Sequence, residues 1–174
     1  VHSIDRERFR AAEPDLVLWM GRASRLHEYL PPIRAALPGV PIVGSDAVAS
    51  APQFTVGDGR WDGVRFVDFV DLDATAKLRD FARRYEERFG REVIGGDALH
   101  YDAMALLLAA LGDGARTAEE IRTFLTSLGR ERPAWEGVTG AIRFDEDGDV
   151  ERTHVLLMMR DDGSGRDAGP SDAR

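Results

Sequence analysis

Small, polar or charged residues directly follow two short apolar segments of the sequence. They are Arg22, Ala23 and Ser24 after the first segment, and Ser45 and Asp46 after the second. A guanidinium and a carboxylate can bind opposite charges on a small polar ligand, and hydroxyl groups can hydrogen-bond to it. Another interpretation stays open for two of them, because Ser24 is equally typical of a helix N-cap and Asp46 of a turn or an N-cap.

The elements that would position these residues form a βαβ pattern. The run Asp15–Gly21 is continuously apolar, as in a strand covered on both faces, and Val40–Gly44 and Gly63–Val70 predict two more strands. Between the first two strands, apolar residues recur at helical spacing at Leu26, Leu30, Ile33 and Leu37. The crossover favours parallel pairing, and ligands bind beyond the carboxyl ends of parallel strands. We therefore expect the five residues to lie together at one edge of a sheet.

Two prolines interrupt the crossover helix of this unit. Pro31 and Pro32 fall inside its apolar stripe. An interior proline costs a helix about 3 kcal/mol. The sequence therefore predicts a kink there, or a break with Pro32 opening a second short helix.

The second part of the chain changes from strands to helices. Apolar stripes and terminal glycines predict three successive helices within 73–129, and Thr117 and Glu120 have the spacing of a capping box. Two strands, Ala141–Phe144 and Thr153–Arg160, are expected to form a hairpin around an acidic Asp-Gly turn. The polar, glycine-rich tail 161–174 is expected to be disordered. The predicted class is α/β, with a parallel sheet, three successive helices and a C-terminal β-hairpin.

Composition and motifs exclude several functional classes. A net charge of −8 argues against nucleic-acid binding, and the absence of cysteine excludes disulfides and thiolate metal sites. The turn with Asp145, Asp147 and Asp149 has its glycine fourth and Leu156 twelfth, which does not fit a calcium-binding EF-hand loop. The four histidines lack ligand spacing, and phosphate-loop and nucleophile-elbow motifs are missing. We expect no cofactor, no metal and no catalytic set.

The order of segments resembles a known family. AAEPDLVLWMG, VPIVGSDAVAS, WDGVRFVDFV, LRDFARRYEERFGREV, ALHYDAMALLLAAL and EGVTGAIRFDEDGD follow one another as in the C-terminal half of a type I periplasmic binding protein. The group it resembles most is the branched-chain amino acid (leucine/isoleucine/valine) substrate-binding proteins of ABC transporters. The resemblance covers Ala11 to about Gly163, so the chain looks like a fragment that lacks the first half.

This resemblance implies a two-lobed protein that closes on a small ligand and presents it to an ABC permease. The implied ligand contacts are Arg22, Ala23, Ser24 and Ser45, with Asp46 meeting the ammonium group of an amino acid. The family often has an aromatic or small polar residue near position 22, so Arg22 could serve an anionic group or exclude the usual ligand. A ligand-sensing domain of a receptor with the same fold is the alternative, and a small α/β enzyme a third.

The resemblance also assigns roles to the parts of the chain and a location to the parent protein. It divides the chain into a second-lobe segment with ligand-facing loops (1–70), helices that pack on the first lobe (71–130), the hairpin (131–160) and the tail (161–174). The helices within 74–128 would then expose an apolar patch, so we expect self-association of the isolated chain. The full-length parent would be a periplasmic or extracellular lipoprotein, although the N-terminal VHSIDRERFRAAEPD is charged where a signal peptide is apolar.

Overall fold

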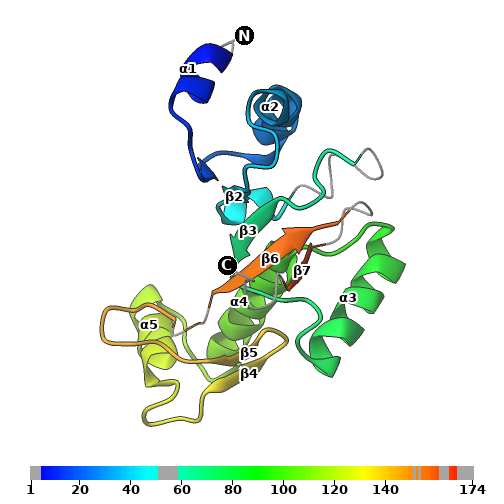
Figure 1. Ribbon diagram of the computed structural model, residues 1–174. Coiled ribbons are helices and arrows are strands. Elements are labelled where there is room, and N and C mark those ends of the chain that lie inside the picture. Colours follow the sequence, from blue (N-terminus) through cyan, green and yellow to red (C-terminus); the bar gives the residue numbers. More distant parts are fainter. Residues whose placement is uncertain (1–4, 51–58, 151, 153, 161–164, 168–174) are drawn as a thin grey trace. The chain divides into compact units, whose positions relative to one another are not determined.

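The computed structural model describes residues 5–50, 59–150, 152, 154–160 and 165–167. The chain divides into two compact units, each of which is described by itself. Unit 1 comprises Val1–Asp71 and His154–Arg174, and unit 2 comprises Leu72–Thr153 (Figure 1). None of the described helices is long and apolar enough to cross a lipid bilayer.

Unit 1 is built on a five-stranded sheet. Its strands are β1 (Val17–Trp19), β2 (Ile42–Gly44), β3 (Arg65–Asp68), β6 (Val155–Met159) and β7 (Gly165–Asp167). The spatial order is β1-β2-β3-β6-β7. β1 and β2, and likewise β2 and β3, pair in parallel, whereas β6 and β7 are antiparallel to their neighbours. The three predicted strands and their parallel pairing are confirmed.

The crossover helix α2 (Ala23–Ala36) covers one face of this sheet. Leu26, Leu30 and Ile33 are buried in a core that also contains Phe66 and Met159. The predicted break at the two prolines is wrong, because α2 is one helix with both inside it. Fully burying each apolar side chain of the stripe contributes about 1.5–3 kcal/mol. Several such residues on both sides of the prolines offset the helix bonds that the prolines remove.

Two short helices flank the unit 1 sheet. In α1 (Arg6–Ala11), the carboxylate of Asp5 accepts the N–H of Arg8 as an N-cap. The guanidinium of Arg10 donates to the carbonyls of Ala35 and Ala36 at the end of α2, at 3.1 and 3.3 Å. These carbonyls lie at the negative end of the helix dipole, so the cation holds α1 to α2. The 3₁₀ helix η1 (Asp46–Val48) follows β2 directly.

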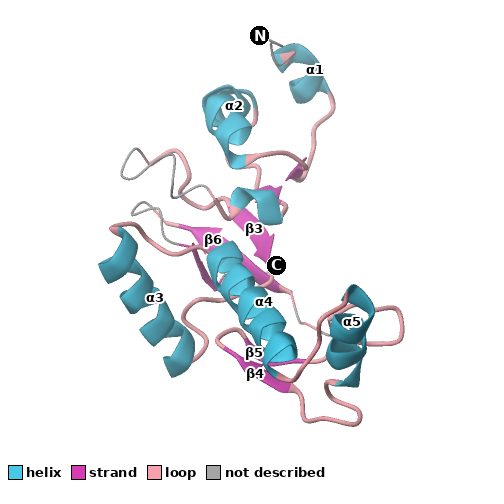
Figure 2. Ribbon diagram, turned by 180° about the vertical axis from the view of Figure 1, so that it is seen from behind, coloured by secondary structure: helices cyan, strands magenta, loops and turns pink. Residues whose placement is uncertain are grey.

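Unit 2 contains the three predicted successive helices and a small hairpin. The helices are α3 (Ala76–Phe89), α4 (Gly95–Gly112) and α5 (Ala118–Ser127), and the hairpin strands are β4 (Trp135–Gly137) and β5 (Gly140–Ile142) (Figure 2). The capping box of Thr117 and Glu120 is confirmed, as is the left-handed glycine that ends α3. α4 and α5 share a core that includes Leu106, Phe124 and Ile142.

The predicted C-terminal hairpin is wrong in its pairing. The Asp-Gly turn forms, and an isolated antiparallel bridge joins Phe144 to Val150. The two flanking strands nevertheless do not pair with each other, because β5 pairs with β4 and β6 pairs with β3. Leu157 and Met159 of β6 are buried in the unit 1 core, and the turn alone offers them no such burial. The expected tail is also ordered in part, since Gly165–Asp167 form β7 on β6.

Candidate functional site

The exits of β1 and β2 lie side by side, as the sequence predicts. Trp19 and Gly44, the last residues of the two strands, are partners in the parallel register. The N–H of Ser45 donates to the carbonyl of Trp19 at 3.1 Å, one step beyond the last strand pair. The two loops that carry the predicted residues are therefore joined at their roots by a backbone hydrogen bond.

The first loop turns from β1 into the start of α2. Arg22 is the N-cap residue, with extended backbone and an exposed side chain that makes no capping hydrogen bond. Trp19 fixes the loop, because its indole Nε1–H donates to the carbonyl of Arg22 at 3.3 Å. Ser24 is half-buried inside the first turn of the helix, so it is not the N-cap. The side chain of Ala23 is fully buried in the core and could reach a ligand through its backbone only.

This loop can hold a negative charge. The carbonyl of Arg22 accepts the N–H groups of Arg25 and Leu26, whereas the N–H groups of Ala23 and Ser24, at the start of the helix, have no intrahelical acceptor. The start of a 14-residue helix carries a partial positive charge. Together with the exposed guanidinium of Arg22, these two N–H groups make a place where a carboxylate can be bound.

The second loop carries a negative charge. Ser45 precedes η1 without a side-chain capping bond, and Asp46 is its first residue, with an exposed carboxylate. Within the described residues the carboxylate of Asp46 accepts no hydrogen bond, so the turn is held by its backbone, whose carbonyl accepts the N–H of Ala49. A Cβ at Gly44 would collide with the buried side chain of Val48. Glycine at this position therefore lets η1 fold closely over the end of β2.

A second acidic residue, which the sequence analysis did not identify, stands at the exit of β3. Asp68 is only 6% exposed, and its Oδ1 accepts the N–H of Phe69 at 2.6 Å. Gly44 pairs with Phe66, and Asp46 and Asp68 each lie two residues after this pair, Asp46 beyond the end of β2 and Asp68 as the last residue of β3. Burial raises the pKa of Asp68 and the charge of Asp46 raises it further, against the lowering effect of N–H groups from Phe69 and Val70. An acid inside the apolar run VRFVDFV was the signal that could have found it.

We expect Asp68→Asn to be more stable than the wild type at neutral pH. A carboxyl group whose folded pKa lies above its unfolded value of about 3.9 holds its proton more tightly in the folded state. The free energy of unfolding therefore falls as pH rises from about 4 through the folded pKa, and the amide variant lacks this fall. Urea unfolding at a series of pH values measures the difference. Glu28→Gln, at an exposed ion pair on α2, is the control and should keep the wild-type pH profile.

The acidic turn at 145–149 is stabilised by its own hydrogen bonds. Asp145 uses its Oδ1 to accept the N–H groups of Asp147 and Asp149, at 3.0 and 2.8 Å, and so closes its own turn. Among the residues that the structure describes, no three His, Asp or Glu side chains are grouped as metal ligands. The charged groups at the exits of β1, β2 and β3 are therefore the candidate site.

Solved structures of solute-binding proteins share this fold. The chain is similar to a leucine-binding protein, LivK, from Thermotoga maritima, with 21% identity and a TM-score of 0.78 over 94% of this chain and 46% of that one. It is similar to LivJ from Streptococcus pneumoniae in complex with isoleucine, with 23% identity and a TM-score of 0.73 over 90% and 45%. A solute-binding protein of an ABC transporter from R. palustris, in complex with benzoate, shows 16% identity and a TM-score of 0.74 over 94% and 45%.

These similarities confirm the expected fold. The chain has an α/β fold of the type I periplasmic binding proteins, and the similar structures include branched-chain amino acid substrate-binding proteins of ABC transporters. No protein-family model and no curated protein matches the sequence. The chain spans about half the length of the solved structures it matches, which agrees with the predicted half-length fragment.

Proposed function

We propose that this chain is the C-terminal half of a solute-binding protein of an ABC transport system, without enzymatic activity. The ligand would be an amino acid or a similar small polar solute. The observation that carries the proposal is the presence of opposite charges at adjacent strand exits, with Arg22 and the start of α2 at one exit and Asp46 at the other. A zwitterion presents both a cation and an anion to such a site.

Each predicted residue has a role in this proposal. Asp46 would receive the ligand ammonium, since its carboxylate is exposed. Arg22 would face an anionic group, aided by the backbone N–H groups of Ala23 and Ser24. Ser45 would orient the second loop, because its N–H is bonded to the first strand. Charge-assisted bonds of this kind strengthen when a cleft closes and excludes water.

The partners and location follow from the same proposal. In the full-length protein, a first lobe would close over the ligand about a hinge, and an ABC permease would receive the ligand. The protein would be a lipoprotein of the periplasm or the outer cell surface. The isolated chain would bind ligand weakly or not at all, because it supplies one wall of the cleft.

We further propose that α4 packs on the first lobe of the full-length protein. Its exposed apolar side chains are Tyr101, Met104, Leu107, Leu108 and Leu111. In a soluble protein, contiguous apolar surface of this kind marks a site of contact. In the isolated chain the same stripe would support non-specific self-association through the helices within 74–128.

Replacing Asp46 tests the proposed site. In a polypeptide that also supplies the first lobe, we expect Asp46→Ala to weaken binding of an α-amino acid at least tenfold, about 1.4 kcal/mol, as measured by calorimetry. Glu28→Ala, which removes an exposed acid from α2, should leave the affinity unchanged. An unchanged affinity for Asp46→Ala would remove this residue from the site.

A further inference from the structure

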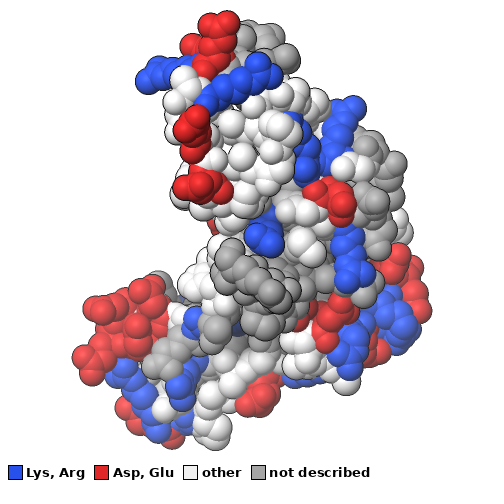
Figure 3. All heavy atoms as spheres, viewed as in Figure 1, with Lys and Arg blue, Asp and Glu red and all other residues white. Residues whose placement is uncertain are grey.

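Asp68 is a buried carboxyl group without a cationic partner among the described residues. An exposed acid such as Glu28 lies beside an arginine, Arg25, at 2.8 Å. Figure 3 shows the same arrangement on the face it presents, where many acidic side chains (red) adjoin basic ones (blue). The hydrogen bonds that Asp68 accepts come instead from the backbone N–H groups of Phe69 and Val70. A buried acid that no cation offsets lowers stability, and such groups are typical of functional sites.

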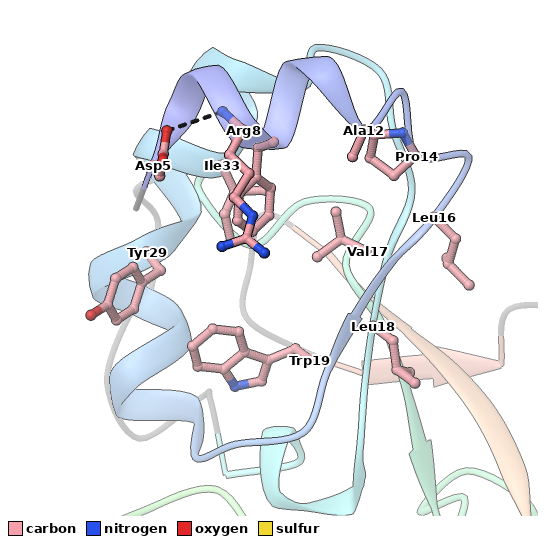
Figure 4. Close-up of a pocket in the computed structure, with 11 residues that line it drawn as sticks. Asp5, Arg8, Ala12, Pro14, Leu16, Val17, Leu18, Trp19, Tyr29 and Ile33 are labelled. Carbon is pink, nitrogen blue, oxygen red and sulfur yellow. Dashed lines mark hydrogen bonds between the residues drawn. The ribbon is translucent and has the colours of Figure 1, made fainter. Parts of the chain in front are cut away.

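Asp68 lies on the face of the unit 1 sheet that α2 covers. Figure 4 shows the side chain of Trp19 directed toward α2 and that of Leu18 directed away from it. Trp19 pairs with Gly44, and Gly44 pairs with Phe66, whose side chain is buried in the core that α2 forms with the sheet. Side chains two residues apart on a strand share one face. The carboxyl group of Asp68 therefore follows Phe66 on the face toward α2, at the carboxyl end of β3.

The same end of the sheet carries Asp46. This residue begins η1, which contacts β3 and folds closely over the end of β2. Asp46 and Asp68 each lie two residues after the pair of Gly44 and Phe66. The two acids are close enough to interact, because the charge of Asp46 raises the pKa of Asp68. An exposed and a buried carboxyl group thus lie at adjacent strand exits of the candidate site.

Among the described residues, Asp46 is the charged group that acts on Asp68. β6 places the apolar Val155 opposite Asp68, and the exposed ring of His154 packs on Phe69, with ring centroids 4.9 Å apart. α2 turns its apolar stripe toward this face of the sheet. A cation held between the two acids would favour the charged form of both, because it offsets their repulsion. The two carboxyl groups can therefore receive an ammonium group together.

We propose that Asp68 is a second carboxylate of the ligand site, and that a primary ammonium group of the ligand displaces its proton. Resting on the proposed function, this role makes Asp68 a specificity-determining residue of the same site. The three N–H groups of the ammonium bond to Asp46 and Asp68 together. The O–H bond of the protonated Asp68 breaks, its electron pair stays on the carboxylate, and the proton passes to the solvent. A quaternary ammonium has no N–H to donate, so the site selects primary amines.

Displacement of a proton makes the affinity for amines depend on pH. Burial holds the pKa of Asp68 above the usual value of about 3.9 for an aspartate. Below the folded pKa, each bound ammonium releases one proton, so the association constant rises up to about tenfold per pH unit. Above it, Asp68 is already charged, and the association constant becomes independent of pH.

Carbon-detected NMR of the 174-residue chain tests the coupling of the two acids without a ligand. Titration of the side-chain carboxyl carbon of Asp68 gives its pKa directly. Asp46→Asn should lower the pKa of Asp68, because it removes the neighbouring negative charge. Glu28→Gln, at an exposed ion pair on α2, is the control and should leave this pKa unchanged. An unchanged pKa of Asp68 in Asp46→Asn would overturn the proposal, since acids that do not interact cannot share one cation.

Calorimetry on the polypeptide that also supplies the first lobe tests the displaced proton. The probe is whichever standard amino acid binds most tightly, titrated from about pH 4 to about pH 8 in buffers of different ionisation enthalpy. Over this range, the wild-type affinity should rise several-fold more than that of Asp68→Asn, and the wild type should release protons that this variant does not. The N-trimethyl derivative of the same amino acid should bind the wild type at least about tenfold more weakly.

The outcomes separate the role of Asp68 from the proposed function. Equal pH profiles and equal proton release for the wild type and Asp68→Asn would overturn the role of Asp68, while leaving Asp46 and the proposed function intact. Equal affinity for the N-trimethyl derivative would overturn the selection of primary amines. Failure of every standard amino acid to bind would instead reject the proposed function, and with it the role of Asp68.

Discussion

Asp102→Ala is expected to lower the free energy of unfolding of unit 2 by about 3 kcal/mol. Asp102 lies on α4 and is 2% exposed. Its Oδ1 accepts the N–H of Val138 at 2.8 Å, and its Oδ2 accepts the N–H and the hydroxyl of Thr139 at 2.9 and 2.5 Å. Val138 and Thr139 form the turn between β4 and β5. The variant leaves these donors without their acceptor, and each buried unsatisfied group costs about 1–3 kcal/mol.

The turn is built closely around this carboxylate. A Cβ at Gly137 would collide with Asp102, so the chain approaches α4 at a position where only glycine fits. The hydroxyl of Thr139, which donates to Asp102, also accepts a hydrogen bond from the guanidinium of Arg152, at 2.7 Å. A water molecule could enter the space left in Asp102→Ala and accept some of these hydrogen bonds. It could not replace all of them, so it would recover only part of the lost free energy of unfolding.

Urea unfolding followed by circular dichroism measures the effect, with hydrogen exchange to assign it to unit 2. Asp102→Asn keeps one side-chain oxygen as an acceptor but replaces the other with an NH2 group, which is a donor and faces the donors of the turn. We therefore expect a loss of unfolding free energy between those of the wild type and Asp102→Ala. Asp113→Ala, at the C-cap of the same helix, is the control, because its ion pair with Arg132 is exposed and should contribute little. A wild-type unfolding midpoint for Asp102→Ala would show that the turn does not depend on this carboxylate.

Local patterns predicted the parts of the fold that depend on local interactions. The apolar spacing of Leu26, Leu30 and Ile33 identified the buried face of α2, and the capping box at Thr117 identified the start of α5. The pairing of β6 could not be found in this way. Its register joins Asp68 to Val155, which are far apart in the sequence, whereas the Asp-Gly turn at Gly148 suggested a nearby partner. A turn signal fixes where the chain reverses, but burial decides which strands pair.

The candidate site was predictable to a similar extent. Strand exits placed Arg22 and Asp46 on neighbouring loops, since the carboxyl ends of parallel strands share an edge. Asp68 and Asp102 were missed as functional or structural centres, although both are acids within apolar segments. Their importance depends on burial and on hydrogen-bond donors supplied by the folded backbone, such as the N–H groups of Phe69 and Val138. Residue type and spacing do not indicate where these backbone donors lie in the folded chain.

Leu26→Ala is expected to destabilise unit 1 by about 3 kcal/mol. Leu26 lies on the buried face of α2, one turn after Arg22, and is fully buried in the core of unit 1. Deletion of such a side chain removes its burial and leaves a cavity, which together cost about 2–5 kcal/mol. Because the same turn of α2 carries Arg22, Ala23 and Ser24, the variant should also loosen the first loop of the site.

The matched control is Leu18→Ala on the other face of the sheet. Its side chain is exposed, so we expect a change below about 0.5 kcal/mol. Urea unfolding compares the two variants, and hydrogen exchange of α2 reports the loosening. Equal losses for Leu26→Ala and Leu18→Ala would show that the burial of Leu26 between α2 and the sheet is not the source of the effect.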